Sequence, residues 1–391
     1  MKTIGIVAEW NPFHNGHQYL IDTIRAEAPE ACIVSIMSGP FCQRGEVASF
    51  DKWQRAEMAL AGGVDVVLEL PQLYATASLE AFAQGGVAGL MAFHPFDVLY
   101  CGSECGDIDS LTAQADYLSS HKENYDAFVH QATNEGTSYA EASQAFLREA
   151  GFDVDKATPN DRLALHYRLA LPRTIPMKLI PRSTAHHSTA AQGQYLSASA
   201  IRQHFPNDFD AIADFLPATS RSIIAQSLAE NWQPANSQAL LTSLKVLACH
   251  WEADTLAQVL TIRDGWTHRL LDAIHKAKDF NTLLTLAQTR HYSRSRIRRL
   301  ILTLLSPLPQ AQEAPAYCRV LGFSGRGQAL LRTRHSACPV IMNTAKDARF
   351  LSANAKALLQ GDINRQNLAD FLSGKPVKNR DYLERPRIFK A

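Results

Sequence analysis

The chain has 391 residues, of which 46% are hydrophobic and 20% are charged, and this balance excludes an intrinsically disordered protein. At ~150 residues per domain, the length predicts two or three domains. No apolar run reaches the ~18 residues that a membrane-spanning helix needs, so we expect no contact with a membrane. The apolar stretch Ile4–Val7 is too short for a signal peptide, and the cysteines are odd in number and scattered, which indicates free thiols. We therefore expect a cytoplasmic protein.

The net charge of +1 conceals two halves of opposite sign. Residues 1–210 hold 14 Lys and Arg against 25 Asp and Glu, a net charge of −11, and residues 211–391 hold 25 against 13, a net charge of +12. A basic half suits a polyanion such as RNA. Basic helices that dock on an acidic domain would give the same asymmetry, and charge by itself leaves both interpretations open.

The first part of the chain alternates predicted strands with predicted helices. Short, β-branched apolar runs predict buried strands at residues 4–8, 33–37, 64–70 and 97–101. Amphipathic stretches between them predict helices at residues 16–27, 51–61 and 78–91. Asp51 is the expected N-cap of the second helix. This alternation predicts an α/β fold, a Rossmann-like domain with a parallel sheet and helices on both faces.

The rest of the chain is predicted to be mostly helical. Residues 175–180 are expected to form the last strand of the sheet, and strand patterns nearly vanish beyond Phe205. Helices are predicted at residues 240–248, 256–262, 269–277, 281–286, 294–305 and 327–334. We therefore predict a Rossmann-like nucleotidyltransferase domain over residues 1–205, with a helical insertion at about 109–172, and a basic, mostly helical domain over residues 206–391.

The first predicted strand leads into the segment Glu9–His17, whose core is His14-x-Gly16-His17 at the start of a helix. Amides at a helix N-terminus attract anions, Gly16 lets a nucleotide approach the backbone, and two imidazoles three residues apart can donate to phosphate oxygens. Such donors stabilise a transition state as charge builds on phosphorus. A turn with two surface histidines and a zinc pair are the alternatives. The strand–turn–helix context favours a nucleotide site.

A second polar element, Leu196–Arg202, places two hydroxyls ahead of a short predicted helix and an arginine inside it. Ser197 or Ser199 would serve as the N-cap of that helix in a purely structural interpretation. In the functional interpretation the two hydroxyls and Arg202 hold the β- and γ-phosphates of a nucleotide. The second interpretation gains weight because His14-x-Gly16-His17 lies on the same predicted domain.

The densest basic run is Arg290–Arg299. On the predicted helix, Arg294 and Arg298 share one side, as do Arg296 and Arg299. These four arginines are either the solvated face of a core helix or contacts to RNA phosphates, and the positive charge around them favours phosphates. Such contacts position an RNA without reading its sequence.

These motifs together resemble the bacterial tRNA(Met) cytidine acetate ligases, of the nucleotidyltransferase superfamily that includes the class I aminoacyl-tRNA synthetases. The matching segments cover most of the chain and are Gly5–His17, Met37–Glu46, Arg55–Leu60, Leu68–Pro71, Gly102–Glu104, Pro159–Asp161, Ile180–Arg182 and Tyr317–Phe323. Trp10 stands where the family more often has tyrosine. Ala198 replaces the second serine of the family's I-S-S-T-x-x-R-type motif.

The resemblance implies a two-step ligase reaction. Acetate attacks the α-phosphate of ATP to give acetyl-adenylate and pyrophosphate, and the wobble cytidine of elongator tRNA(Met) then takes the acetyl group to become N(4)-acetylcytidine. His14, His17 and Arg202 are the implied catalytic residues, and the four arginines are the expected tRNA contacts. The implied ATP-binding residues are Ile6, Val7, Glu9, Asn11, Pro12, Phe13, His14, Asn15, Gly16, His17, Tyr19, Gly102, Asn160, Arg182, Ser197 and Ser199.

The loop Met37–Gly45 follows the second predicted strand, at the edge where ligands bind open α/β sheets. Its polar groups are candidates for the acetate pocket, with Arg44 as a partner for a carboxylate or phosphate, although its glycines alone explain a loop. Mg²⁺ would help by neutralising phosphates, but we expect no dedicated metal site in the protein. The rival functions are a small-molecule adenylyltransferase of the same superfamily and a non-catalytic tRNA-binding protein.

Overall fold

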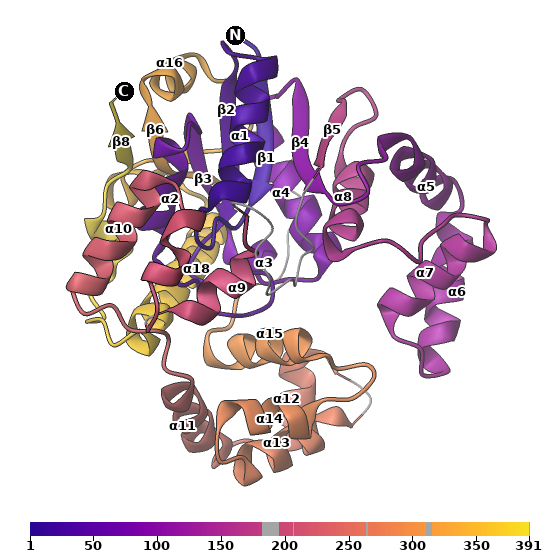
Figure 1. The fold of residues 1–391 in the computed structure, drawn as a ribbon. Coiled ribbons are helices and arrows are strands. Elements are labelled where there is room, and N and C mark those ends of the chain that lie inside the picture. Colours follow the sequence, from indigo (N-terminus) through magenta and orange to yellow (C-terminus); the bar gives the residue numbers. More distant parts are fainter. Residues whose placement is uncertain (182–194, 206, 263–264, 310–314, 391) are drawn as a thin grey trace.

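The computed structural model describes residues 1–181, 195–205, 207–262, 265–309 and 315–390. Its centre is a mostly parallel sheet in the order β5-β4-β1-β2-β3-β6-β7, with β8 paired to β6 (Figure 1). The first part of the chain supplies β1 (Thr3–Ala8), α1 (Asn15–Glu27), β2 (Cys32–Ser38), α2 (Lys52–Ala61), β3 (Val66–Leu70), α3 (Gln72–Ala75), α4 (Leu79–Phe93) and β4 (Val98–Ser103). The α/β alternation predicted for this part is confirmed.

Every residue of β2 and β3 is buried, which requires helices on both faces of the sheet. Alternate side chains serve two cores: Ile33 packs on the side of α1 and α2, and Val34 packs on the side of α4. Asp51 caps α2, as predicted, because its side chain accepts a hydrogen bond from the backbone N–H of Gln54.

The predicted insertion projects to one side of the sheet as α5 (Ile108–Ser120), α6 (Lys122–Asn134) and α7 (Tyr139–Glu149) (Figure 1). It has a small apolar cluster of its own that includes Leu118, Leu147 and Val154. The chain returns through α8 (Pro159–Ala170), which packs against α4 and leads into β5 (Met177–Pro181) at the edge of the sheet.

A second group of helices lies below the sheet in Figure 1. The chain first packs α9 (Ala198–His204), η1 (Asp210–Phe215) and α10 (Ala218–Ala229) beside the α/β layers. Residues 237–305, here called the helical module, then form a separate core from α11 (Ser237–Ala248), α12 (Ala253–Leu260), α13 (Trp266–Lys276), α14 (Phe280–Ala287) and α15 (Arg294–Leu305). None of the described helices combines the length and apolarity needed to cross a bilayer.

The chain then re-enters the sheet, and the expectation that residues 175–180 form its last strand was wrong. The elements after the helical module are β6 (Cys318–Ser324), α16 (Gly325–Thr333), β7 (Val340–Ile341), α17 (Thr344–Asp347), η2 (Ala348–Phe350), α18 (Ala353–Leu372), α19 (Arg380–Leu383) and β8 (Arg387–Phe389). β6 pairs antiparallel with β3. The sheet therefore extends past the boundary predicted at residue 206, and the division into two domains there stays a prediction.

Buried charges attach this returning segment to the first part of the chain. Lys52 Nζ lies 2.8 Å from a carboxylate oxygen of Glu69 and 2.6 Å from one of Asp381. Arg319 on β6 contacts the same two carboxylates, at 3.3 Å in the case of Glu69. The four side chains are at most 4% exposed, so each charge depends on the others for the polar partners that water would provide.

Replacement of Asp381 by alanine is therefore expected to lower the free energy of unfolding by about 3–5 kcal/mol at pH 7, because Lys52 and Arg319 lose a buried partner. Despite burial, Lys52 and Arg319 lower the pKa of Asp381 to about 2. A carboxyl group with a depressed pKa stabilises the fold above its unfolded pKa of roughly 3.9 and loses this effect as the pH falls through the folded value.

Urea unfolding at pH 7 and at about pH 3 measures both effects. The difference between wild type and Asp381→Ala should shrink at the lower pH. Lys122→Ala is the control, since Lys122 forms an exposed pair with Asp126 and its loss should leave the midpoint unchanged. An equal effect of the two substitutions would contradict the stabilising role of the buried cluster.

Candidate active site

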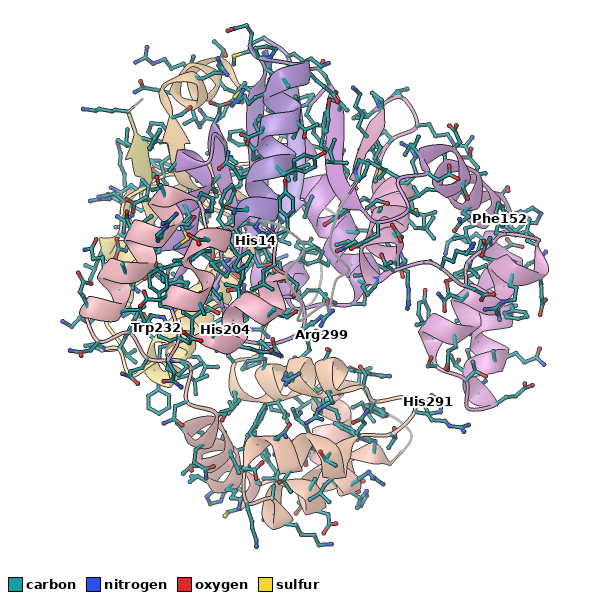
Figure 2. All side chains as sticks on the ribbon, in the orientation of Figure 1. His14, Phe152, His204, Trp232, His291 and Arg299 are labelled. Carbon is teal, nitrogen blue, oxygen red and sulfur yellow. The ribbon has the colours of Figure 1, made fainter. Side chains whose placement is uncertain are left out.

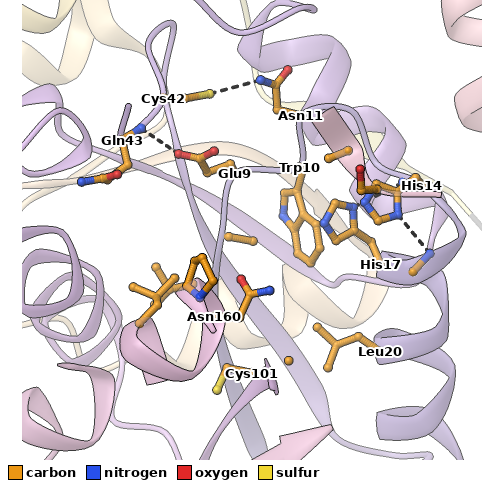
Figure 3. A pocket seen from close by; sticks show the side chains of 18 of the residues that line it. Glu9, Trp10, Asn11, His14, His17, Leu20, Cys42, Gln43, Cys101 and Asn160 are labelled. Atoms are coloured by element: carbon orange, nitrogen blue, oxygen red, sulfur yellow. Dashed lines mark hydrogen bonds between the residues drawn. The ribbon is translucent and has the colours of Figure 1, made fainter. Parts of the chain in front are cut away.

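A cavity of about 270 Å³ opens at the carboxyl ends of β1 and β4 (Figure 3). These strands are neighbours, yet the chain builds β2 and β3 on one side of β1 before it crosses to β4 on the other. Connections leave the two strands in opposite directions at such a switch point, which makes it the usual ligand site of open α/β sheets. Figure 3 shows the turn after β1 on one wall and Asn160 on the opposite wall.

His14 and His17 cap the start of α1. The Nδ1 atom of His14 accepts a hydrogen bond from the backbone N–H of Gly16 at 3.0 Å, and His17 Nδ1 accepts from the backbone N–H of His14 at 3.3 Å. The two rings stack with their centroids 3.8 Å apart (Figure 3). The pair is a capping box in which two imidazoles replace the usual hydroxyl and carboxylate.

This arrangement fixes the tautomer of both histidines. A neutral imidazole that accepts at Nδ1 carries its proton on Nε2. Both His14 and His17 line the cavity, and the Nε2 atom of His14 is itself buried in this structure. N–H donors held in place before the reaction are the groups that stabilise charge on phosphate oxygens in a transition state.

The side chain of Trp10 packs against the ring of His17. Its backbone has a φ of 47°, in the left-handed region that aromatic residues seldom adopt. The indole N–H donates to the hydroxyl of Ser35 on β2 at 3.0 Å. The rings of His17 and Trp10 are nearly perpendicular, with their centroids 4.8 Å apart. A backbone in an uncommon conformation that is held by several contacts is typical of functional sites.

The second polar element meets the first at the cavity. Ser197 caps α9 by accepting from the backbone N–H of Ala200 at 3.2 Å, and its hydroxyl lies 3.1 Å from that of Ser199. Arg202 donates to the backbone oxygen of Asn11 at 2.8 Å. The structural and functional interpretations of Ser197 are compatible, because its oxygen caps the helix while the residue lines the cavity.

The opposite wall is formed by the end of β4 and the start of α8. The amide Nδ2 of Asn160 donates to Glu104 Oε1 at 2.6 Å, and the Thr158 hydroxyl donates to Glu104 Oε2 at 2.6 Å. A carboxylate only accepts, so the amide of Asn160 turns its NH₂ toward Glu104 and leaves its oxygen as the group that a ligand can meet. Asp161 ties the two elements together by accepting from the Ser103 hydroxyl at 2.6 Å.

Residues 39–48, here called the pocket loop, close the cavity between these walls. The backbone N–H of Gln43 donates to the carboxylate of Glu9 at 2.7 Å, and Asn11 donates to the sulfur of Cys42 at 3.3 Å (Figure 3). Burial raises the pKa of the Cys42 thiol, so Cys42 is a neutral, unreactive wall residue. Cys42, Gln43, Arg44 and Glu46 all line the cavity, as the sequence suggested for Arg44.

Arg55 holds the strand ends and the pocket loop in register, and sequence reasoning gave it no role in the site. Its fully buried guanidinium donates to the backbone oxygens of Glu9 at 2.7 Å, Ser38 at 3.0 Å and Phe50 at 2.9 Å, and also to that of Gly39. The matching segment Arg55–Leu60 was the only signal in the sequence that pointed to it.

Most residues that the sequence assigned to the nucleotide share this cavity, namely Ile6, Val7, Glu9, Asn11, His14, Gly16, His17, Tyr19, Gly102, Asn160, Ser197, Ser199 and Arg202. Pro12, Phe13 and Asn15 belong to the same turn without lining the cavity. Phe13 is buried in the core, and Asn15 donates to the backbone oxygen of Asp214. Arg182 lies outside the described residues. The roles of all these residues stay predictions.

The lining residues that the sequence did not single out are mostly apolar and include Leu79, Phe82, Leu163, Tyr167 and Tyr195. On amphipathic helices such as α4 and α8, an apolar wall of a pocket has the same spacing as a core face, so no sequence signal separates the two. In the described part of the chain, no group of three or more His, Cys, Asp or Glu side chains is placed to hold a metal ion.

The four arginines of α15 do not share one environment. Arg296 is exposed and its guanidinium lies over the ring of Tyr292, and Arg294 contacts Asn281. Arg298 pairs with Glu46 at 3.2 Å, and Arg299 donates to the backbone oxygen of Gln43 at 3.3 Å. Two of the predicted RNA contacts therefore touch the pocket loop in this structure.

Comparison with known proteins is consistent with this site. A family model described as HIGH Nucleotidyl Transferase matches residues 1–383. The chain therefore belongs to the HIGH nucleotidyltransferase family.

Within that family the chain groups with the tRNA(Met) cytidine acetate ligases. It is 32% identical to the protein of that name from Geobacillus sp. over 87% of this chain and 88% of the relative. It is 33% identical to that from Listeria welshimeri over 96% of this chain and 95% of the relative.

Two solved structures of Thermotoga maritima TmcAL have the same fold. The apo form matches with a TM-score of 0.90 at 27% identity, over the full length of both chains. A form bound with alpha-thio ATP matches with a TM-score of 0.88, again at 27% identity and over both whole chains. The Rossmann-like HIGH fold and the family that the sequence indicated are thereby confirmed.

Gly16→Ala is expected to weaken ATP binding roughly tenfold. A Cβ at this position would lie 2.9 Å from Cε1 and 3.1 Å from Nδ1 of His14, so the imidazole must move. The fold should persist, because alanine is favoured over glycine within a helix. Calorimetric titration with ATP measures the change. Gly325→Ala is the control, because its Cβ would enter open space; equal affinity in the two variants would contradict a role of the His14 position.

Proposed function

We propose that this chain is a cytoplasmic, ATP-dependent ligase that acetylates the wobble cytidine of elongator tRNA(Met). In the first step a carboxylate oxygen of acetate attacks the α-phosphorus of ATP, and the bond to the β,γ-pyrophosphate breaks. In the second step the exocyclic amine of cytidine attacks the acetyl carbonyl, and AMP leaves while the amine gives up a proton. The products are N(4)-acetylcytidine, AMP and pyrophosphate.

One observation carries the first step: His14, His17, Ser197, Ser199 and Arg202 surround a single cavity at the switch point of the sheet. N–H donors of the two histidines would stabilise the oxygens that gain charge as pyrophosphate leaves. The serines and Arg202 would hold the β- and γ-phosphates, and Asn160 and Gly102 would face the nucleoside. Mg²⁺, whose preferred ligands are oxygens, would enter with those phosphates.

The pocket loop is the candidate site for acetate. Arg44 and Gln43 line the cavity on the side of the turn after β1, and the Glu9 carboxylate is engaged by the backbone of Gln43. The guanidinium of Arg44 would pair with the carboxylate of acetate. The apolar side chain of Cys42 would suit its methyl group.

The names of the relatives and the charge distribution support tRNA as the acceptor. The basic half of the chain contains the helical module, and Arg296 on α15 is exposed to solvent. Such side chains would bind the phosphate backbone. Selection of one cytidine would require that the base be unstacked and bound in a pocket next to the adenylate.

The decisive experiment is ATP–pyrophosphate exchange with and without acetate, first in the absence of tRNA and then in its presence. Exchange that requires acetate would support carboxylate activation, and mass spectrometry of tRNA nucleosides would then identify the acetylated base. Adenylation of a small phosphorylated metabolite without acetate would instead identify an adenylyltransferase. A protein that binds tRNA without making pyrophosphate or AMP would be a binding protein only.

His17→Ala should reduce the acetate-dependent exchange rate by about 10²–10³, because one donor to the developing charge is lost. Initial rates at saturating ATP measure this. Gln18→Ala is a neighbouring control on the same helix, whose side chain bonds Asp22 and Gly62 outside the cavity. Unchanged turnover of His17→Ala would exclude a catalytic role.

Replacement of both Arg294 and Arg296 by alanine should weaken binding to tRNAs of different sequence by the same factor, because phosphate contacts do not read the bases. If each arginine neutralises one phosphate, the slope of log K against log salt should fall by about 2. Filter binding over a range of salt concentrations measures the slope. Lys346→Ala, which removes an exposed cation of α17, is the matched control. A parallel shift of both variants, or no shift, would contradict RNA contacts at α15.

A further inference from the structure

The helical module approaches the nucleotide cavity through the pocket loop, on which α15 packs. At Gly45 the backbone of the pocket loop lies directly against the backbone of α15. Gly45 has a φ of 75°, and a Cβ added there would lie 2.8 Å from Cβ of Arg298 and 2.9 Å from the backbone nitrogen of Arg299. Only glycine combines this conformation with this approach, so the loop is fitted directly onto the helix.

Side chains reinforce the contact on both sides of Gly45. Arg298 pairs with Glu46 at 3.2 Å, and Phe41 packs with Leu302 in a small apolar cluster. Arg299 donates to the backbone oxygen of Gln43 at 3.3 Å. Figure 2 shows Arg299 on the side of α15 that faces the α/β part of the molecule.

Gln43 connects this contact to the cavity. Its backbone N–H donates to Glu9 at 2.7 Å, its side chain donates to the backbone oxygen of Ala77 at 3.0 Å, and its own backbone oxygen accepts from Arg299. Gln43 and Glu9 both line the cavity. A change at Arg299 thus reaches two lining residues through the backbone of one residue, Gln43.

We propose that Arg299 is a positioning residue of the ATP-dependent half-reaction, acting through Gln43 and Glu9, and not a ligand of tRNA phosphates. This inference rests on the proposed function and refines it. It divides α15 in two: Arg296 faces solvent and is available to RNA, whereas Arg298 and Arg299 fasten the pocket loop. The helical module is then a structural part of the nucleotide site as well as a binding surface.

Burial of the guanidinium is consistent with this role. It lowers the pKa of Arg299 to about 10, which leaves the group charged at pH 7. A charged donor strengthens its hydrogen bond to a carbonyl oxygen.

The test compares Arg299→Ala, Arg299→Lys and Gly45→Ala with wild type in acetate-dependent ATP–pyrophosphate exchange without tRNA. Arg299→Ala should raise the KM for ATP roughly tenfold and leave kcat within about twofold, because the lining residues are displaced but the phosphate donors are not. Lysine should recover part of the loss by donating to the same carbonyl. Gly45→Ala should reproduce the loss with Arg299 intact, since its Cβ pushes the loop off α15.

Lys276→Ala is the matched control, because it removes a cation of the same module that pairs with Asp272 on the surface. It should change neither parameter. Binding of tRNA to Arg299→Ala should keep the salt slope of wild type. An unchanged KM together with a slope reduced by about 1 would overturn the proposal and assign Arg299 to a phosphate.

Two further outcomes also decide the matter. If Arg299→Lys is as impaired as Arg299→Ala and both melt at lower temperature, the residue only stabilises the fold, and the proposal is overturned. If wild type shows no exchange with or without tRNA, the proposed function fails, and calorimetric titration with ATP decides this inference separately. Roughly tenfold weaker ATP binding by Arg299→Ala than by Lys276→Ala would then support it, and equal binding would overturn it.

Discussion

The buried guanidinium of Arg55 is the contact on which the site depends. Among the described residues it forms no ion pair with a carboxylate, and it donates instead to backbone oxygens at the ends of β1 and β2 and on both sides of the pocket loop. A cation in this position must have all of these acceptors or pay a large desolvation cost, so their relative positions are fixed before any ligand arrives. Preorganisation of this kind allows the histidines of α1 and the serines of α9 to meet at one cavity.

The cavity also depends on parts of the chain that are far from it in sequence. The returning strand β6 and the cluster of Lys52, Glu69, Arg319 and Asp381 fasten the end of the chain beside β3, and Arg299 joins the helical module to the pocket loop. Both contacts replace water around charged groups by polar partners from another segment. Segments on both sides of the predicted domain boundary therefore contribute to the surroundings of the cavity.

The sequence predicted the local structure well and the long-range structure poorly. Periodicity and capping residues such as Asp51 located the helices and strands of the first part, and His14-x-Gly16-His17 located one wall of the cavity, since these signals are local. The antiparallel pairing of β6 with β3 had no local signal, because a short apolar strand does not specify its partner. The four arginines of α15 are equivalent in the sequence, and their tertiary contacts separate Arg296 from Arg299 in the structure.

The return of the chain to the sheet has a consequence for synthesis on the ribosome. β3 is buried throughout, and its outer edge is covered by β6, which is translated roughly 250 residues later. At about 5–20 residues per second, that edge stays unpaired for roughly 10–50 s. An apolar strand with a bare edge is prone to pair with other chains, so the nascent protein passes through an interval in which chaperones or the helices already made must shield it.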